Sequence, residues 1–228
     1  MKDIIKHYGE KFNFLKSLIK KEDPSIIEIG AHYGEDTLRL AHTFPEAKIY
    51  CFEPDPRNIA IFKKHVSNEN IFLSEVALSN KDGESPFYQS YQEGNEVPLK
   101  YDWINEEDYN KFLLNNSGSS SLKEGYKYTL SSSINVKTER FDNWYDRNAP
   151  GDIDFAWIDV QGAEKEVIEG MGEIINSIKY IWMEYGEEDY EGGMSWRQTV
   201  VLLKERNFIE IRTDSAGSKG DILFKRDE

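Results

Sequence analysis

The stretch IIEIGAHYGEDT, residues 26–37, decides the fold that we predict for this chain. Its apolar start is followed by two glycines, Gly30 and Gly34, and then by a helical pattern that begins near Thr37. This order predicts a buried strand, a tight turn and the N-terminus of a helix. A glycine has no Cβ and readily adopts positive φ, so a ligand can approach such a turn closely. Ligands of open α/β sheets bind beyond the carboxyl ends of the strands, and we therefore expect a binding site at this turn.

The glycine spacing is G-x-x-x-G, which differs from the G-x-G-x-x-G of dinucleotide-binding turns. It suits a nucleoside with an amino-acid tail better than a pyrophosphate. Apolar runs predict strands at 25–30, 48–52, 71–76, 85–90, 134–138, 153–160, 178–185, 208–212 and 221–224. Helical patterns lie at 4–20, 35–43, 57–66, 163–170 and 195–206, and another helix starts at 141–145. This alternation predicts an α/β fold with a mainly parallel sheet, and the short loop before the last strand favours an antiparallel end.

Length and charge limit the function classes. The 228 residues fit one α/β domain, 1–228, with a helical cover at 1–22. The net charge of −14 repels phosphate backbones and anionic membranes, so we expect no nucleic-acid substrate. No apolar run approaches the roughly 18 residues of a membrane span, so we expect no membrane insertion. Cys51 is the only cysteine, which is typical of a reducing compartment and predicts a cytoplasmic protein.

The long segment 91–133 is rich in tyrosine, tryptophan, asparagine and serine. A connection of this length inside a compact domain is usually functional or disordered, and the aromatic content argues against disorder. We predict a lid over the substrate, partly helical near 105–114. Aromatic faces can stack on the C–H surface of a sugar, while asparagine and serine can bind its hydroxyl groups. The alternative is a segment that packs only against itself.

Acidic residues lie within or just after several predicted strands: Glu28, Glu53, Asp55, Asp159 and Glu184. The carboxyl ends of parallel strands meet at one edge of a sheet, so we expect most of these side chains around one cleft. Glu53 lies 23 residues after Gly30, where an acid commonly accepts hydrogen bonds from ribose hydroxyls. Nicotinamide and S-adenosyl cofactors both carry such a ribose, and the residues alone leave both open.

A set of motifs resembles the FkbM family of S-adenosylmethionine-dependent methyltransferases. The matching pieces are EIGAHYG (28–34), FEPDP (52–56), ALSN (77–80), SSSL (119–122), VKT (136–138), FD (141–142), IDVQGAE (158–164) and EVIEG (166–170). The resemblance implies a class I, Rossmann-like fold with a seven-stranded, mainly parallel sheet, one antiparallel strand and helices on both faces. It also implies methylation of a hydroxyl, commonly on a sugar or polyketide. Two departures are His32, where the family more often has asparagine, and Glu139-Arg140, where it usually has Thr-Leu-Asp.

The resemblance implies contacts to the cofactor, S-adenosyl-L-methionine, from Glu28, Gly30, Ala31, His32, Gly34, Thr37, Glu53, Pro54, Asp55, Val76, Ala77, Asp159 and Gln161. Glu53 would hold the ribose, and Asp55 with the backbone at 76–77 would flank the adenine. Thr37 is equally well explained as a helix cap. Contacts to the substrate would come from Ser120, Ser121, Glu164 and Tyr185. Gln161 and Glu164 have the alternative of only shaping their turn.

Methyl transfer to a hydroxyl requires removal of its proton, and a carboxylate in the cleft can act as the general base. We predict Asp159 for this role, with Glu184 and His32 as alternatives. Asp159 and Glu184 could instead hold Mg²⁺, which would lower the pKa of the hydroxyl. Two other function classes stay open: a nicotinamide-dependent oxidoreductase and a non-catalytic S-adenosylmethionine-binding protein.

Overall fold

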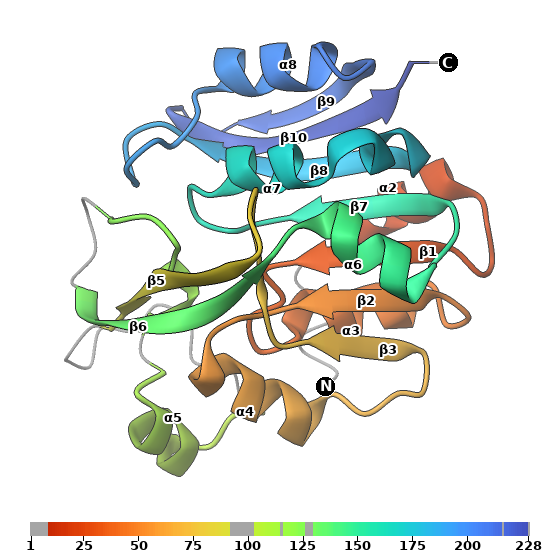
Figure 1. The fold of residues 1–228 in the computed structure, drawn as a ribbon. Coiled ribbons are helices and arrows are strands. Elements are labelled where there is room, and N and C mark those ends of the chain that lie inside the picture. Colours follow the sequence, from red (N-terminus) through yellow and green to blue (C-terminus); the bar gives the residue numbers. More distant parts are fainter. Residues whose placement is uncertain (1–8, 92–102, 115, 126–129, 216, 228) are drawn as a thin grey trace.

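A computed structural model describes residues 9–91, 103–114, 116–125, 130–215 and 217–227 (Figure 1). Seven strands form the central sheet: β1 (Ser25–Ile29), β2 (Lys48–Phe52), β3 (Ile71–Ser74), β7 (Ile153–Ile158), β8 (Ile178–Gly186), β9 (Phe208–Ser215) and β10 (Lys219–Arg226). The helices are α2 (Gly9–Ile19), α3 (Glu35–Thr43), α4 (Pro56–His65), α5 (Glu106–Phe112), α6 (Phe141–Asn148), α7 (Glu164–Gly170) and α8 (Trp196–Lys204). Two 3-10 turns complete this set, η1 (Ser117–Ser119) and η2 (Gly172–Ser177).

The central sheet has the strand order β3-β2-β1-β7-β8-β10-β9. Strands β3, β2, β1, β7 and β8 pair in parallel, and β10 pairs antiparallel with both β8 and β9. The predicted sheet of seven strands, with one antiparallel strand, is therefore confirmed. The strand order reverses between β1 and β7, which is where open α/β sheets bind their ligands.

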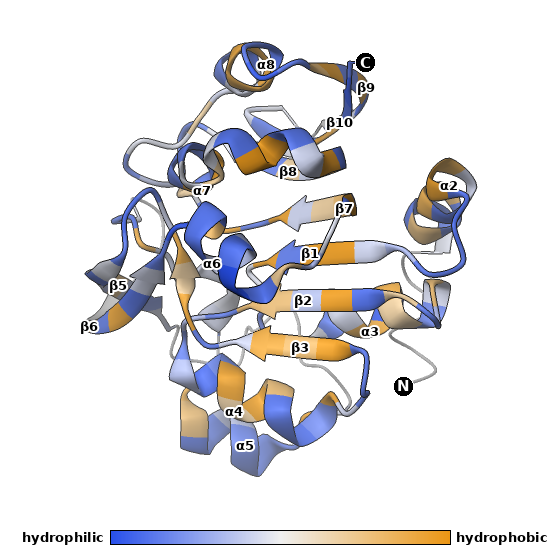
Figure 2. Ribbon diagram, turned by 45° about the vertical axis from the view of Figure 1, so that its right-hand side comes forward, coloured by the Kyte–Doolittle hydropathy of each residue, from blue (hydrophilic) through white to orange (hydrophobic). Residues whose placement is uncertain are grey.

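Both faces of the sheet are buried, because side chains alternate along each strand. Ile27 and Ile29 of β1 pack in one cluster with residues of α6, α7 and α8. Ile26 packs on the other face with Phe12 and Leu15 of α2 and with residues of α3 and α4. Figure 2 shows the resulting pattern, with hydrophobic strands inside and hydrophilic helix surfaces outside. Helices on both faces were predicted, and the structure confirms them.

A small second sheet lies on the side to which the arrows of β1, β2 and β3 point (Figure 1). It consists of β4 (Ala77–Leu78), β6 (Leu130–Glu139) and β5 (Gly83–Ser90), in that order. The prediction of one strand over 71–76 was wrong at its end, because β3 stops at Ser74 and Ala77 pairs with Thr138 instead. Sequence periodicity shows that a segment is extended, but it does not show which partner accepts its hydrogen bonds.

The predicted lid, 91–133, is described in part, and 92–102, 115 and 126–129 lie outside the described residues. Helix α5 falls within the predicted helical region near 105–114. Tyr109 and Leu114 are buried in a cluster with Tyr33 and Ile61 of the central domain. This part of the segment therefore packs against the binding turn, and its role as a lid stays a prediction.

The predicted N-terminal cover is described from residue 9 onward, as α2. Phe12 stacks on Trp157 with ring centroids 5.9 Å apart. Lys11 places its Nζ 4.2 Å from the ring centroid of Trp157 and 4.3 Å from that of Trp182, and it pairs with Asp221 at 3.0 Å. Cation–π contacts and this ion pair thus fix α2 on the sheet.

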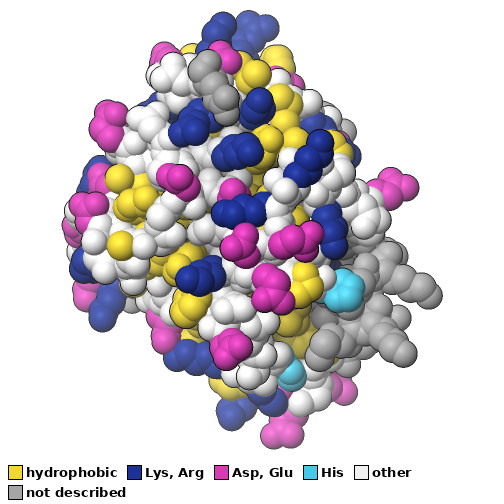
Figure 3. Space-filling model, turned by 90° about the vertical axis from the view of Figure 1, so that its right-hand side faces the viewer, with side chains coloured by type: hydrophobic (Ala, Val, Ile, Leu, Met, Phe, Trp, Pro, Cys, Tyr) yellow, Lys and Arg dark blue, Asp and Glu magenta, His cyan; other side chains and the backbone are white. Residues whose placement is uncertain are grey.

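The face at the amino ends of the strands carries Lys, Arg, Asp and Glu side chains intermixed (Figure 3). It lies opposite the small sheet in Figure 1. No helix within the described ranges is long and apolar enough to cross a membrane.

Candidate active site

Gly30 ends the first strand and brings two strand ends into contact. Its φ is +92°, and a Cβ at this position would lie 1.8 Å from the backbone oxygen of Asp159. The N–H groups of Gly30 and Ala31 both donate to the carbonyl of Phe52 at 3.0 Å. Glycine is thus required because the turn is pressed between the ends of β2 and β7.

Gly34 has the same φ of +92°, and a Cβ there would lie 2.4 Å from a methyl carbon of Val66. It occupies the N-cap position of α3 without a side-chain cap. A side chain at this position would clash with Val66 at the end of α4, and this clash explains why the residue is glycine. A contact with the methionine part of a cofactor stays a prediction.

His32 connects three parts of the site and has the left-handed φ of 50°. Its N–H donates to Glu53 Oε2 at 2.9 Å. Its ring lies 2.7 Å from Glu35 Oε1 through Nδ1 and 3.1 Å from Ser117 Oγ through Nε2. Burial lowers the pKa of His32, but Glu35 and other nearby acids outweigh burial and the pKa is raised. The histidine therefore connects the glycine turn to Glu53, which follows β2, and to the 117–121 segment.

Glu28 lies inside the fold, with 2% of its surface exposed. The hydroxyl of Thr37 donates to Glu28 Oε2, and Cys51 Sγ lies 3.5 Å from the same oxygen. Burial raises the pKa of Glu28 well above its ordinary value. Thr37 is completely buried and α3 is capped at Gly34, so the structure makes Thr37 a partner of Glu28 and not a helix cap.

Glu53 follows β2 and is also buried. Its Oε1 accepts from the N–H of Asp55 at 2.8 Å and from Asn58 Nδ2 at 3.2 Å. Burial and the neighbouring Asp55 raise the pKa of Glu53 to about 7. Asn58 Oδ1 is buried and, among the residues described, has no hydrogen-bond partner. A buried acceptor without a donor suggests a ligand with donor groups, and sequence reasoning missed Asn58.

Asp55 is fully buried and was predicted to flank an adenine. Its side chain caps α4 through the N–H of Arg57 at 2.9 Å and pairs with the Arg57 guanidinium at 2.6 Å. Gln89 Nε2 donates to it at 3.0 Å. These contacts use its carboxylate oxygens, and its place beside an adenine stays a prediction. The sequence offered no signal for Arg57, since its partners other than Asp55 lie far along the chain.

The backbone at 76–77 was also predicted to flank the adenine, and Pro54 to contact the cofactor; both stay predictions. Val76 packs against the core cluster of the central sheet. Ala77 is 6% exposed and packs with Phe87 and Val136 of the small sheet. Pro54 is partly exposed beside Glu53.

The ends of β7 and β8 bring Asp159 and Glu184 together. Gln161 donates through Nε2 to Asp159 Oδ1 at 2.5 Å and to Glu184 Oε2 at 2.9 Å. Burial raises the pKa of both carboxyl groups, and Asp159 raises that of Glu184 further. The interaction between the two carboxyl groups opposes the rise in the pKa of Asp159 and adds to the rise in the pKa of Glu184. The two groups therefore affect each other's titration.

The magnesium alternative used this same pair. Within the described part of the chain, no group of three or more His, Cys, Asp or Glu side chains could hold a metal ion. The amide nitrogen of Gln161 also points at both carboxyl groups. Magnesium stays a prediction that chelation can test.

Glu164 opens α7 and accepts from the N–H groups of Val160 at 3.3 Å and Gly162 at 3.1 Å. Burial raises its pKa to about 7. These bonds fit the alternative in which Glu164 shapes the turn after β7.

The other predicted substrate contacts are occupied by the protein itself. Ser121 Oγ donates to the carbonyl of Gln161 at 2.6 Å, and Ser120 Oγ donates to that of Ser117 at 2.7 Å. Tyr185 is 3% exposed and belongs to the core cluster. Their roles toward a substrate stay predictions.

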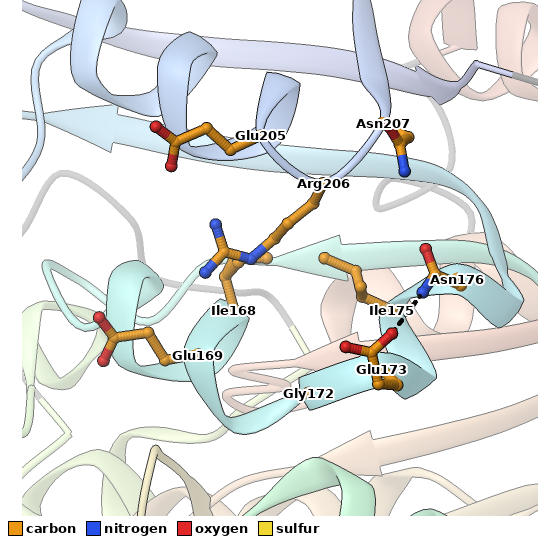
Figure 4. Close-up of a pocket in the computed structure, with 9 residues that line it drawn as sticks. All are labelled: Ile168, Glu169, Gly172, Glu173, Ile175, Asn176, Glu205, Arg206 and Asn207. Carbon is orange, nitrogen blue, oxygen red and sulfur yellow. Dashed lines mark hydrogen bonds between the residues drawn. The ribbon is translucent and has the colours of Figure 1, made fainter.

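A hollow between α7, η2 and the end of α8 lies apart from the residues described above (Figure 4). Its lining includes Asn176, just before β8, and Asn207, just before β9, so it lies near the amino ends of strands. Glu173 accepts a hydrogen bond from Asn176 Nδ2 at 3.2 Å on its rim. The predicted catalytic residues Asp159 and Glu184 lie at the opposite edge of the sheet.

The strand order, the glycine turn and the acids at the carboxyl edge define the class I methyltransferase fold. The chain belongs to the FkbM methyltransferase family, because the family model described as Methyltransferase FkbM domain matches residues 28–210. Comparison with known proteins finds the 2-O-methyltransferase NoeI of Sinorhizobium fredii, which is 32% identical over 214 residues, 92% of this chain and 82% of that protein.

Solved structures show the same fold at low sequence identity. A putative rRNA-methylase from Clostridium thermocellum superposes with a TM-score of 0.54 at 12% identity, covering 96% of this chain and 95% of that one. Aeropyrum pernix fibrillarin, in complex with natively bound S-adenosyl-L-methionine, has a TM-score of 0.51 at 13% identity and covers 95% and 74%. At this identity the likeness shows the fold alone.

Proposed function

We propose that this methyltransferase uses S-adenosyl-L-methionine to methylate a hydroxyl of a sugar, a glycan or a related small molecule. The observation that carries the proposal is the Asp159–Glu184 pair, which two parallel strands and Gln161 hold at the carboxyl edge. The relative that is 32% identical is a 2-O-methyltransferase, which supports a hydroxyl acceptor.

The cofactor would lie over the glycine turn, with its ribose at Glu53. These residues fit the cofactor, because Glu53 can accept hydrogen bonds from the two ribose hydroxyls. Asn58 Oδ1 beside it is a second acceptor and lacks a donor among the described residues. When bound, S-adenosylmethionine supplies an activated methyl group on a sulfonium. The protein then has to orient the acceptor and take up its proton.

Asp159 is the proposed proton acceptor. The acceptor oxygen loses its proton to the Asp159 carboxylate and forms the new O–CH₃ bond while the S–CH₃ bond breaks. Glu184, whose pKa burial raises, stays protonated and donates to Asp159. General-base catalysis of this kind contributes roughly 10²–10⁴-fold. If the pair bound Mg²⁺ instead, a chelator would abolish activity and added Mg²⁺ would restore it.

Calorimetry and a labelling assay test the proposal. We expect S-adenosylmethionine and S-adenosylhomocysteine to bind and NAD to give no heat. Protein incubated with methyl-labelled cofactor should transfer label to a member of a panel of neutral oligosaccharides. Binding of NAD instead would support the oxidoreductase alternative, and cofactor binding without transfer would support the non-catalytic one. Transfer to RNA, included as a second acceptor class, would contradict the predicted exclusion of nucleic acid.

A further inference from the structure

The backbone at Gln161 has an uncommon conformation at the centre of the site. Its φ is 55°, a left-handed value that costs free energy for a residue with a Cβ, and Gly162 follows at 96°. Such a conformation persists where surrounding contacts determine it. One contact is the hydroxyl of Ser121, which donates to the Gln161 carbonyl at 2.6 Å.

A second contact comes from Tyr190, in the connection between β8 and α8. Tyr190 is 4% exposed, and its hydroxyl lies 2.9 Å from Gln161 Oε1 and 3.0 Å from the carbonyl oxygen of Ser119. A Cβ at Gly162 would lie 2.5 Å from the Cβ of Tyr190. The glycine therefore lets Tyr190 pack directly against the turn.

These contacts determine which way the Gln161 amide points. A hydroxyl donor faces Oε1, and two carboxyl groups face Nε2. An amide rotated by half a turn would place its oxygen against the carboxyl oxygens and its NH₂ group against Tyr190. The Tyr190 hydroxyl has one hydrogen for two acceptors, Gln161 Oε1 and the Ser119 carbonyl oxygen. When that hydrogen goes to Oε1, it favours the orientation in which Gln161 donates to Asp159 and Glu184.

We propose that Tyr190 is a positioning residue of the methyl-transfer site, which holds the Gln161 amide across the Asp159 and Glu184 carboxyl groups. The proposal rests on the proposed function, because it assigns the reaction to that pair. Tyr190 acts through Gln161 and touches none of the reacting atoms. It lies 29 residues from Gln161 along the chain, so only the fold brings the two together.

The amide itself can be observed by NMR without any substrate. The Gln161 side-chain NH₂ signals are assigned by their loss in Gln161→Ala. In the wild-type protein we expect them dispersed and slow to exchange, because both carboxyl groups accept from this group. Tyr190→Phe keeps the ring and removes the hydroxyl, and it should bring the signals toward those of free glutamine. Tyr145→Phe is the matched control, because Tyr145 lies on α6 and its hydroxyl is bonded at 3.0 Å to the carbonyl of Gly151 and, among the described residues, not to Gln161. Unchanged Gln161 signals in Tyr190→Phe would overturn the proposal.

Kinetics provide the second test, with an oligosaccharide acceptor from the panel. Tyr190→Phe should lower kcat by about 10-fold, the effect of one hydrogen bond, and leave the Kd of S-adenosylhomocysteine unchanged. In the Gln161→Ala background the same substitution should have no further effect, because its action passes through that amide. Additive losses in the double variant would refute the mechanism and indicate a general structural role. If no acceptor is methylated, the proposed function fails, while the NMR result still decides whether Tyr190 holds the amide.

Discussion

The carboxyl edge of the sheet has two halves with the same residue types in different settings. At the ends of β1 and β2, Glu28, Glu53 and Asp55 are buried and accept from hydroxyl, backbone and guanidinium donors. At the ends of β7 and β8, Asp159 and Glu184 face each other and share the amide of Gln161. The kind of partner separates the two halves, because the acids of the first half accept from fixed donors of the protein, whereas the carboxyl groups of the second half face each other across one amide.

Under the proposed function, we expect the first half to support the site and the second half to carry the chemistry. Asp55 shows the supporting role most clearly, since its partner Arg57 also donates to the carbonyls of Ser90 and Leu113 at 3.1 and 3.0 Å. That guanidinium joins the loop after β2 to the segment predicted as a lid. Substitution of one residue at a time tests this difference between the two halves.

The largest effect is expected from Arg57→Met in the first half. It leaves the fully buried Asp55 carboxylate without its cation, and such a loss costs about 3–5 kcal/mol of unfolding free energy. Urea denaturation measures the change. Lys63→Met is the control, because the Lys63–Glu75 pair lies at the surface with side chains 57% and 51% exposed. Equal losses in the two variants would contradict the supporting role of Arg57.

Glu164→Gln should change how stability depends on pH. Burial raises the pKa of Glu164 from 4.5 to about 7, so the folded state holds a proton that the unfolded state has released between these values. The free energy of unfolding therefore falls as pH rises from 4.5 to 7, by about 3 kcal/mol from this group. Glutamine keeps the acceptor oxygen and does not titrate, so the stability of wild type relative to the variant should fall over this range. A constant difference would contradict the raised pKa, and Glu173→Gln, at an exposed site, is the control.

Asp159→Asn should separate chemistry from binding in the second half. The amide cannot take up the acceptor proton, so kcat should fall by roughly 10²-fold or more. Cofactor affinity, measured by calorimetry, should stay within a few-fold of wild type because Glu53 lies in the other half. Methylation at the wild-type rate would remove Asp159 from the mechanism.

Glu53→Ala should have the smallest effect, and only on binding. A ribose would lose a charged acceptor, and S-adenosylhomocysteine should bind more weakly by about 1–3 kcal/mol. The rate at saturating cofactor should stay close to that of wild type. Calorimetry that shows undiminished affinity would exclude Glu53 from the cofactor site.

The glycine turn and the acids at strand ends could be predicted because they depend on local patterns. Gly30 ends an apolar run, and Asp159 and Glu184 end two others, so topology alone places them at one edge. The roles of Thr37, Asp55 and Ser121 could not be predicted, because each depends on a partner distant in the chain or in a neighbouring strand. Arg57 and Tyr190 were missed because they bond to groups far along the chain. Asn58 was missed because its burial beside Glu53 exists only in the folded chain.

By itself, the sequence determined the alternation of strands and helices and the parallel sheet with its antiparallel end, and it predicted a site at the carboxyl edge. Periods of two and 3.6 residues are visible without knowing any partner. Only the tertiary structure decided that Ala77 joins a second sheet, that Asp55 faces Arg57 and that Gln161 bridges two carboxyl groups. Hydrogen bonds and burial act between groups that are close in space, and that closeness exists only once the chain has folded.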